Sequence, residues 1–567
     1  MKNSEIADVF DQLADVLEFK GEMVFKVNSY RKAARTLRDT SEDIAVVAAE
    51  NRLANLPGIG KSTAEKIQEY LKTGKIKKYE EERKGLSDEL ISMLQIPGMG
   101  PKSLALIHSR LKIDTFAALE DAIHSGRLAE LPGMGEKKGE NILKGIQLLR
   151  EASKRIPLGV ALPIAEQVLD EVRKFKSVRR AELAGSLRRM RETIGDIDIL
   201  ASASDHKKAI EAFAALPQVK RVLAAGTTKA SVIVQGNQQI DLRVVDEECF
   251  GAALQYFTGS KEHNIKLRDI AKGLGLKINE YGVFRGDKKV GGKEEKEIYE
   301  AIGLQWMPPE IREDRGEIEA AKEGSLPALV TSKQIKGDLH VHSNFSDGRA
   351  TLEQLAEQAE ALGYKYIAVT DHSQSLKIAR GLTPERVEQK GKEIQKINSK
   401  LKSLKLLLGT ELDILGDGGL DYPDKLLEKF DWVVASIHSG FKQPREKITR
   451  RITSAMENPF VDCIAHPTGR LIGQRSPYEV DVEELLAVAA KTGTAIEINA
   501  NYDRLDLDDI WCKRAKELGV KLAIGTDAHH LDHMNMIRLG VAVARRGWLE
   551  ATDILNTLPL KKLRQKR

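Results

Sequence analysis

Residues 338–348 read DLHVHSNFSDG, and the pattern that begins here decides the fold of the C-terminal part of the chain. His340 and His342 lie at the end of a short apolar run, and Asp347 follows closely. The runs YKYIAVTDH, KLLLGTELD, WVVASIH, VDCIAH and KLAIGTD also end at a histidine or an acid. Many strands therefore deliver possible metal ligands to one place. The further candidates are His372, Glu411, His438, His466, Asp527 and His529.

The residue types in this set indicate its chemistry. A single histidine after a strand is most often structural, but six of the twelve histidines of the chain fall in these positions. Imidazole together with carboxylate suits zinc, manganese or iron, whereas all-oxygen sites suit calcium or magnesium. Nine candidate ligands without a cysteine indicate more than one ion. Clustered ions activate water and bind both oxygens of a phosphoester displacement, so we expect hydrolysis of a phosphate ester.

Helical stretches such as TLEQLAEQAEAL and VEELLAVAAKTG separate these strands. Strand alternating with helix predicts a parallel sheet, and functional residues at strand C-termini are typical of barrels. About seven such units fit between Lys336 and the end of the chain. This segment resembles the PHP (polymerase and histidinol phosphatase) domain, a (β/α)7 barrel that holds three metal ions, here expected to be manganese or zinc. The resemblance implies one ion on His340, His342, Glu411 and Asp527, a second on Glu411, His438 and His466, and a third on Asp347, His372 and His529, while His530 and His533 match no ligand position.

Length and composition set limits on the rest of the protein. The chain has 567 residues, too many for one core, so several domains are expected. We find no apolar stretch of membrane-spanning length and no signal-peptide pattern, which predicts a cytoplasmic protein without a membrane partner. Its three cysteines provide neither a disulfide framework nor a zinc motif. A net charge of +5 permits nucleic-acid binding without demonstrating it.

The N-terminal third contains three copies of an apolar-Pro-Gly-x-Gly motif: LPGIGKSTAEKI (56–67), IPGMGPKSLALI (96–107) and LPGMGEKKGENI (131–142). The two glycines permit a tight turn at a helix start, where free N–H groups can bind phosphate. One such turn is often only a structural corner, but three with nearby lysines resemble the helix-hairpin-helix motif, which binds the DNA backbone. Such contacts position a protein on DNA without reading its sequence. The expected DNA-binding glycines are Gly58, Gly60, Gly98, Gly100, Gly133 and Gly135.

A second candidate catalytic site lies in AELAGSLRRMRETIGDIDILAS (181–202). Asp196 and Asp198 are two residues apart on a predicted strand, so their carboxylates point to the same face. Asp241 in QQIDLRVV adds a third acid, and an oxygen-rich site of this kind suits a pair of magnesium ions for nucleotidyl transfer. Alternating acids on an exposed strand are the alternative for Asp-x-Asp alone. The preceding Gly185-Ser186, suited to a phosphate-binding turn, favours the catalytic site.

This pattern resembles the nucleotidyltransferase palm of the family X (DNA polymerase beta-like) DNA polymerases, and the resemblance covers about residues 1 to 317. The segment ALQYFTGSKEHNIKLRDIA (253–271) matches the family's sugar-contacting turn and the positions that face the nascent base pair. An aromatic residue at Tyr256 could equally pack in a core. The resemblance implies magnesium binding by Asp196, Asp198 and Asp241, and nucleotide binding by Gly185, Ser186, Arg189, Tyr256, Phe257, Gly259, Asn264 and Arg268.

In the same family the N-terminal domain sometimes removes a deoxyribose phosphate through a lysine Schiff base. The stretch FKVNSYRKAAR supplies Lys26, Tyr30 and Arg31 in matching order, and Lys66 aligns with the nucleophile. Lys26 and Tyr30 are expected to contact DNA. A further basic position of the family is Ser62 here, so phosphate binding by Lys66 is at least as well supported as lyase chemistry.

The resemblances predict a multidomain chain with an α+β polymerase core between helical and barrel domains. Residues 318–335 contain Gly, Ser and Pro, which predicts a linker that lets the barrel swing. The expected domains are an all-α helix-hairpin-helix N-terminal (lyase-like) domain (1–82), a helix-hairpin-helix fingers domain (83–155), a nucleotidyltransferase palm (156–245), a thumb (246–317), the linker (318–335) and the PHP barrel (336–567).

Together these features predict an enzyme of DNA repair, of the base excision type, that adds nucleotides at short gaps. The barrel is expected to act as a 3′–5′ exonuclease or an end-processing phosphodiesterase, with abasic-site cleavage as a further possibility. The expected partners are gapped, nicked or primer-template DNA and dNTPs, with the protein a monomer in the cytoplasm, associated with the nucleoid.

Two alternatives belong to other classes of function. One is a non-catalytic scaffold that binds DNA ends and hydrolyses only through its barrel. Three converging carboxylates disfavour it, because they repel one another without metal. The other is a nucleotidyltransferase for RNA or a small acceptor, which the DNA-binding repeats and the Tyr-Phe-Thr-Gly-Ser turn disfavour.

Overall fold

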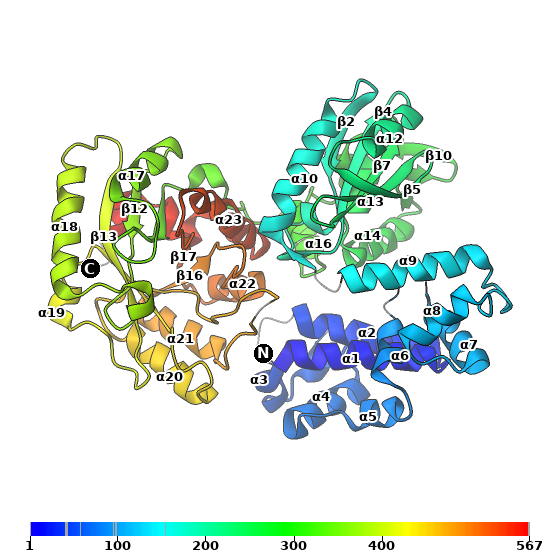
Figure 1. The fold of residues 1–567 in the computed structure, drawn as a ribbon, viewed down its shortest axis with the longest axis horizontal. Helices are drawn as coiled ribbons and strands as arrows, with labels where there is room; N and C mark the ends of the chain where they lie inside the picture. Colours follow the sequence, from blue (N-terminus) through cyan, green and yellow to red (C-terminus); the bar gives the residue numbers. More distant parts are fainter. Residues whose placement is uncertain are drawn as a thin grey trace. The chain divides into compact units, whose positions relative to one another are not determined.

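The computed structural model describes residues 2–39, 44–56, 58–94, 96, 99–152, 155–473 and 475–564. It divides into two compact units, Met1–Arg155 and Ile156–Arg567, which we describe separately (Figure 1). In the described residues, no helix combines the length and the apolar character needed to cross a membrane.

Within the described residues, the regular secondary structure of the first unit is all helical, and it packs around two cores. One core joins α1 (Lys2–Phe19), α2 (Val24–Asp39), α3 (Ile44–Ala49), α4 (Lys61–Thr73) and α5 (Lys77–Arg83) around residues such as Phe10, Leu13 and Ile67. The other joins α6 (Asp88–Met93), α7 (Pro101–Leu111), α8 (Phe116–His124) and α9 (Glu136–Ala152) around Leu104, Leu119 and others. Each set of helices thus buries its own apolar stripe, and Phe19 of α1 extends into the second core.

The second unit begins with a five-stranded sheet in the order β2-β4-β7-β6-β5. These strands are β2 (Val178–Leu183), β4 (Ile197–Ala203), β7 (Gln239–Val245), β6 (Lys229–Val234) and β5 (Val219–Ala225). Only β4 and β7 are parallel. Apolar residues of α10 (Leu158–Arg173) and α12 (His206–Ala214) share a core with these strands. Leu200 packs instead with α13 (Phe250–Thr258), so helices contact both faces of the sheet.

The thumb region follows with its own core. It contains α14 (Lys261–Gly273), the antiparallel strands β8 (Lys277–Asn279), β9 (Gly282–Arg285) and β10 (Lys288–Gly291), and α15 (Glu295–Glu300). Ile318 and Ala321 of α16 (Glu317–Glu323) are buried in this same core.

The C-terminal part is a barrel of seven parallel strands that neighbour one another in chain order. The first and last strands meet at a seam, where the His342 N–H donates to the Ala528 carbonyl (2.9 Å) and the Asp527 N–H donates to the His340 carbonyl (2.9 Å). The strands are β11 (Gly337–Val341), β12 (Tyr366–Val369), β13 (Lys405–Asp413), β14 (Trp432–Ser436), β15 (Cys463–Ile464), β16 (Ala495–Asn499) and β17 (Leu522–Gly525).

Helices surround these strands, as in Figure 1. They include α17 (Leu352–Ala361), α18 (Pro384–Asn398), α20 (Arg445–Met456), α21 (Val482–Thr492), α22 (Asp509–Glu517) and α23 (Ile537–Arg546). Both faces of the strands are therefore buried, which explains why their sequences are mostly apolar.

The segment between thumb and barrel differs from the expected swinging linker. Its first part is α16, which belongs to the thumb core. Further along, the Val330 N–H donates to the Leu549 carbonyl (2.9 Å), and Leu329 forms a bridge with Glu550. The physical reason is that Ile318, Leu329 and Val330 are buried, so leaving the segment free would expose apolar surface.

Candidate active sites

The palm acids lie on neighbouring parallel strands. Asp198 of β4 is directly opposite Asp241 of β7, and Asp196 immediately precedes β4. Burial raises the pKa of Asp198, and the nearby Asp196 and Asp241 carboxylates raise it further, to about 7. Three carboxylates so close together form a site for cations, because a divalent ion removes their mutual repulsion.

Two cations beside these acids were not anticipated from the sequence. Lys229 of β6 forms an ion pair with Asp241 (Nζ to Oδ2, 2.6 Å). Arg243 lies two residues after Asp241 on β7, and its guanidinium is 4.3 Å from the centre of the Phe257 ring. Both line one pocket with Asp198 and Asp241. The spacing Asp241-x-Arg243 on a strand places both side chains on one face, so the sequence could have indicated that Arg243 lies beside the acids.

The expected phosphate turn is the short helix α11 (Gly185–Arg188), next to the acids. Gly185 has φ +60°, and a Cβ here would collide with the Asp198 carboxylate, so only glycine lets the turn come this close. The Arg189 side chain donates to the Thr258 carbonyl (Nη1, 2.6 Å) and to Glu313 (Nε to Oε1, 3.1 Å). Its guanidinium is therefore already paired with protein groups in this structure.

The predicted sugar-contacting residues lie at the end of α13 and the start of α14. The Asn264 side-chain amide donates to the Tyr256 carbonyl (2.7 Å) and accepts from Gln255 (2.7 Å), which fixes the turn against α14. The Tyr256 and Phe257 rings pack edge to face, with centres 5.1 Å apart. Arg268 is exposed one helical turn beyond Asn264, on the same side of α14.

The glycine motifs of the first unit have the geometry of helix starts. Gly60 and Gly100 are the N-caps of α4 and α7, and Gly135 directly precedes α9. An added Cβ at any of these three would meet no atom within 4 Å, so the backbone is open there. Gly58 and Gly133 adopt positive φ (82° and 72°), as the preceding turn requires. Gly98 lies outside the described residues.

The predicted lyase residues are partly assembled. Lys66 donates to the Ser62 hydroxyl (2.8 Å), and its Nζ is 5.7 Å from the centre of the Tyr30 ring. Lys26 forms an ion pair with Glu22 (3.1 Å), and Arg31 pairs with Asp15 and Glu18. Lys66 thus has a hydroxyl for a neighbour where the related family has a basic group.

All nine predicted ligands of the barrel converge at the C-terminal ends of its strands. We call these nine residues the barrel cluster. Glu411 lies at the centre: its Oε1 is 2.9 Å from His466 Nε2 and 3.3 Å from His438 Nε2, and its Oε2 is 2.9 Å from His372 Nδ1. Three groups have geometry suited to one ion each: His342, Asp347, His372 and His529; His340, His342 and Asp527; and His372, Glu411 and His438.

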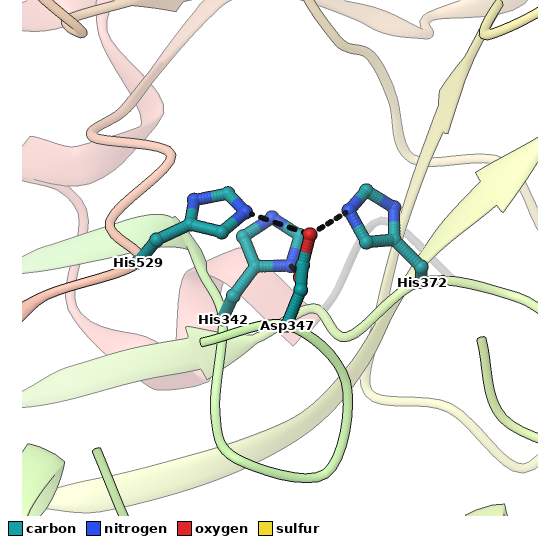
Figure 2. Close-up of side chains that lie close together, drawn as sticks. All are labelled: His342, Asp347, His372 and His529. Atoms are coloured by element: carbon teal, nitrogen blue, oxygen red, sulfur yellow. Dashed lines mark ion pairs between the residues drawn. The ribbon is translucent and has the colours of Figure 1, made fainter. Parts of the chain in front are cut away.

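Asp347 bridges two histidines at the rim of the cluster. Figure 2 shows its carboxylate between His529 and His372, with Oδ2 at 3.3 Å and 3.5 Å from their Nε2 atoms. Burial lowers the pKa of His372, but the carboxylates of Glu411 and Asp347 outweigh it and raise the pKa to about 10. His342 differs, because burial and the neighbouring His529 and His372 lower its pKa to about 4.

The donor set fits divalent cations. His340 Nε2 and His342 Nε2 lie 3.1 Å apart, and with a carboxylate oxygen of Asp527 they form one of the three groups. The buried Nδ1 atoms of His342 and His466 have no hydrogen-bond partner among the described residues. Imidazole nitrogens and carboxylates directed at common points are the ligands of zinc, manganese and iron. His530 and His533 lie with ring centres 4.9 Å apart and join none of the three groups.

Residues around the cluster were missed by sequence reasoning. Glu497 is 1 % exposed; it accepts from His340 Nδ1 (2.6 Å) and from the His466 N–H (2.7 Å). Arg504 Nε is 3.4 Å from Asp527 Oδ2, and Arg504 Nη1 is buried without a hydrogen-bond partner among the described residues. Glu497 could have been identified from the sequence as an acid inside the apolar run TAIEINA, because a buried carboxylate needs hydrogen-bond or charged partners nearby.

Comparisons with known proteins cover nearly the whole chain. Family models match as "Helix-hairpin-helix domain" (1–76), "SAM-like Helix-hairpin-helix tandem" (89–147), "DNA polymerase beta thumb" (253–313) and "PHP domain" (338–501). The chain is 41 % identical over 567 residues to the DNA polymerase/3′–5′ exonuclease PolX of Bacillus subtilis (strain 168), covering 99 % of this chain and 98 % of that protein. It is 31 % identical over 232 residues to a probable phosphatase of Thermoanaerobacter sp. (strain X514), covering 39 % of this chain and 89 % of the relative.

Proposed function

Because the chain belongs to the PolX family of DNA polymerase/3′–5′ exonucleases, we propose that the palm acids and the barrel cluster are its two active sites. The palm would extend a primer 3′-hydroxyl at short gaps, and the barrel would remove nucleotides from 3′ ends. The observation that carries this proposal is the convergence of each acid or histidine set, from separate strands, on one place.

In the palm, Asp196, Asp198 and Asp241 would hold magnesium, which when bound lowers the pKa of the attacking hydroxyl and neutralises the phosphates. Lys229 balances the charge of Asp241. Gly185 lies beside Asp198, and with Ser186 it forms the start of α11, which would accept a triphosphate. Tyr256, Phe257 and Gly259 would contact the sugar, with Asn264 and Arg268 facing the base pair. Arg189 as a triphosphate ligand remains a prediction, since it would have to release a present partner.

In the barrel, the nine ligands would hold up to three manganese or zinc ions, which when bound supply an activated water and clamp the phosphodiester. Glu497 orients His340 and holds the main chain of His466. Arg504 Nη1, which has no hydrogen-bond partner in the described part of the chain, would donate to a phosphate oxygen beside Asp527. Processing of blocked 3′ ends and cleavage at abasic sites are further reactions that this site could support.

The first unit would bind gapped, nicked or primer-template DNA through its open glycine turns. Lys26, Tyr30 and the turn at Gly58–Gly60 belong to one helical domain and would contact the backbone together. Lys66 would bind the 5′ phosphate or attack a deoxyribose phosphate as a Schiff-base nucleophile. We expect a monomer with this set of substrates.

One experiment tests the two sites. The purified protein is incubated with labelled gapped DNA, in magnesium or manganese, with and without dNTPs. We expect Asp198→Ala to lose extension and keep degradation, and His342→Ala to show the opposite. Asp170→Ala, on an exposed face of α10, and His530→Ala, outside the three ion groups, are the matched controls. Extension by Asp198→Ala or degradation by His342→Ala would overturn the site assignments.

A second substrate for the barrel is supported by its likeness to probable phosphatases. We propose that it also hydrolyses 3′-phosphate monoesters at DNA ends. The test compares release of inorganic phosphate from a 3′-phosphorylated oligonucleotide with that from p-nitrophenyl phosphate. Equal turnover of both would favour a small-molecule phosphatase instead.

A further inference from the structure

Arg546, at the end of barrel helix α23, is a junction between barrel and polymerase core. It is 5 % exposed. Its guanidinium donates through Nη2 to Asp509 of barrel helix α22 (2.6 Å), and through Nη1 to Glu313 Oε1 (3.0 Å) and the Arg189 carbonyl (2.7 Å). The last two residues belong to the thumb and the palm, so one barrel side chain binds both parts of the polymerase core.

Arg189 is where these contacts reach the expected nucleotide site. Its carbonyl follows α11, the helix that begins with Gly185 and Ser186. Its side chain holds the Thr258 carbonyl, in the Tyr256–Ser260 turn, and the Glu313 carboxylate. Arg189 thus directly follows the expected phosphate turn and contacts the expected sugar turn, and its own carbonyl accepts a hydrogen bond from Arg546 of the barrel.

Opposite charges hold the side chains around Arg546 together. Burial raises the pKa of Glu313, but Arg546, Arg189 and Arg191 outweigh it and lower the pKa to about 2. Arg315 adds a second ion pair to Asp509 (Nη1 to Oδ2, 2.9 Å). Removing one partner of a buried network leaves an uncompensated charge, so the remaining groups must move or take up water.

We propose that Arg546 is a positioning residue for nucleotide addition, so that the barrel braces the nucleotide site of the polymerase. The inference rests on the proposed nucleotide role of Gly185–Ser186 and the 256–260 turn. Among the described residues, the hydrogen-bond and ion-pair partners of Arg546 include none of the barrel cluster. Loss of this residue should therefore weaken dNTP binding and spare exonuclease activity.

The test measures kcat and KM for dNTP in single-nucleotide gap filling by the full chain. Arg546→Met should raise the dNTP KM by on the order of 10- to 100-fold, because small displacements of binding groups have large kinetic effects. Arg546→Lys should recover part of the loss. Arg545→Met is the matched control. Arg545 also joins the barrel to the core, through Glu310 (2.7 Å) and the Val330 carbonyl (2.9 Å), but among the described residues its side-chain hydrogen-bond partners do not include Arg189.

Degradation of single-stranded DNA by the same samples reports whether the barrel is folded. A dNTP KM within twofold of wild type in an exonuclease-active Arg546→Met protein overturns the inference, as does an equal rise in Arg545→Met. Should Arg546→Met not fold, Glu313→Gln decides the question by the same KM criterion. If the wild-type chain fills no gap, the proposed function itself is wrong, which is a different outcome.

Discussion

Replacement of Glu497 by glutamine tests the geometry of the barrel cluster without removing any ligand. The Glu497 carboxylate accepts a 2.6 Å hydrogen bond from His340 and a 2.7 Å hydrogen bond from the His466 main chain. Glutamine is almost the same size, but it has one acceptor oxygen and no charge. It must therefore present an N–H group to one of these two donors.

The expected magnitude follows from the lost bond. A hydrogen bond to a charged group contributes about 1.5–3 kcal/mol. Since about 1.4 kcal/mol corresponds to a factor of ten, we expect metal affinity to fall about 10- to 100-fold, the range typical of outer-shell partners.

The assay is a manganese titration of the apoprotein by calorimetry, together with exonuclease activity at limiting and saturating manganese. We expect Glu497→Gln to lose activity at limiting manganese and to regain much of it at saturation. Glu353→Gln, on the exposed start of α17, is the matched control. Unchanged manganese affinity in a folded Glu497→Gln protein would refute this account of the site.

Three further predictions use other features. A Cβ at position 525 would collide with the Glu497 carboxylate and with His340. Gly525→Ala should therefore lower both the manganese affinity and the melting temperature, which calorimetry can measure. An unchanged manganese titration would contradict this prediction. Burial and the neighbouring acids raise the pKa of Asp198 to about 7. Below this pKa protons compete with cations for the carboxylate, so the rate of gap filling at limiting magnesium should rise between pH 6 and 8. More magnesium should move the midpoint to lower pH, and a midpoint independent of magnesium would argue against this cause. Finally, EDTA should lower the melting temperature of the wild type by more than that of His342→Ala, because ions bound only to the folded state stabilise it.

The convergence of the barrel cluster could be predicted from the sequence because both of its determinants are local. A histidine after an apolar run identifies the end of a strand, and parallel strands in a barrel bring such ends together. The same holds for Asp198 and Asp241, whose strands are direct neighbours. In each case, hydrophobic period and fold class specify the approximate position of the side chain.

Contacts between domains were not predictable in this way. Arg546 and Glu313 are far apart in the sequence and carry no motif, and their pairing depends on how the barrel packs against the thumb. The prediction that residues 318–335 form a swinging linker was wrong for a related reason. The Gly, Ser and Pro of this segment indicated a linker, while Leu329 and Val330 pair with Leu549 and Glu550, more than 200 residues later in the chain.

The seam between β11 and β17 has a consequence for the order in which the parts of this enzyme can fold during synthesis. His340 and His342 lie on the first strand and Asp527 follows the last, with Thr526 donating to Asp338 across the seam (2.5 Å). During synthesis the polymerase core leaves the ribosome long before the last strand that completes this ligand set. A nascent chain can thus fold its palm and thumb while the barrel cluster still lacks Asp527 and His529, and before Arg546 is available to contact Arg189 and Glu313.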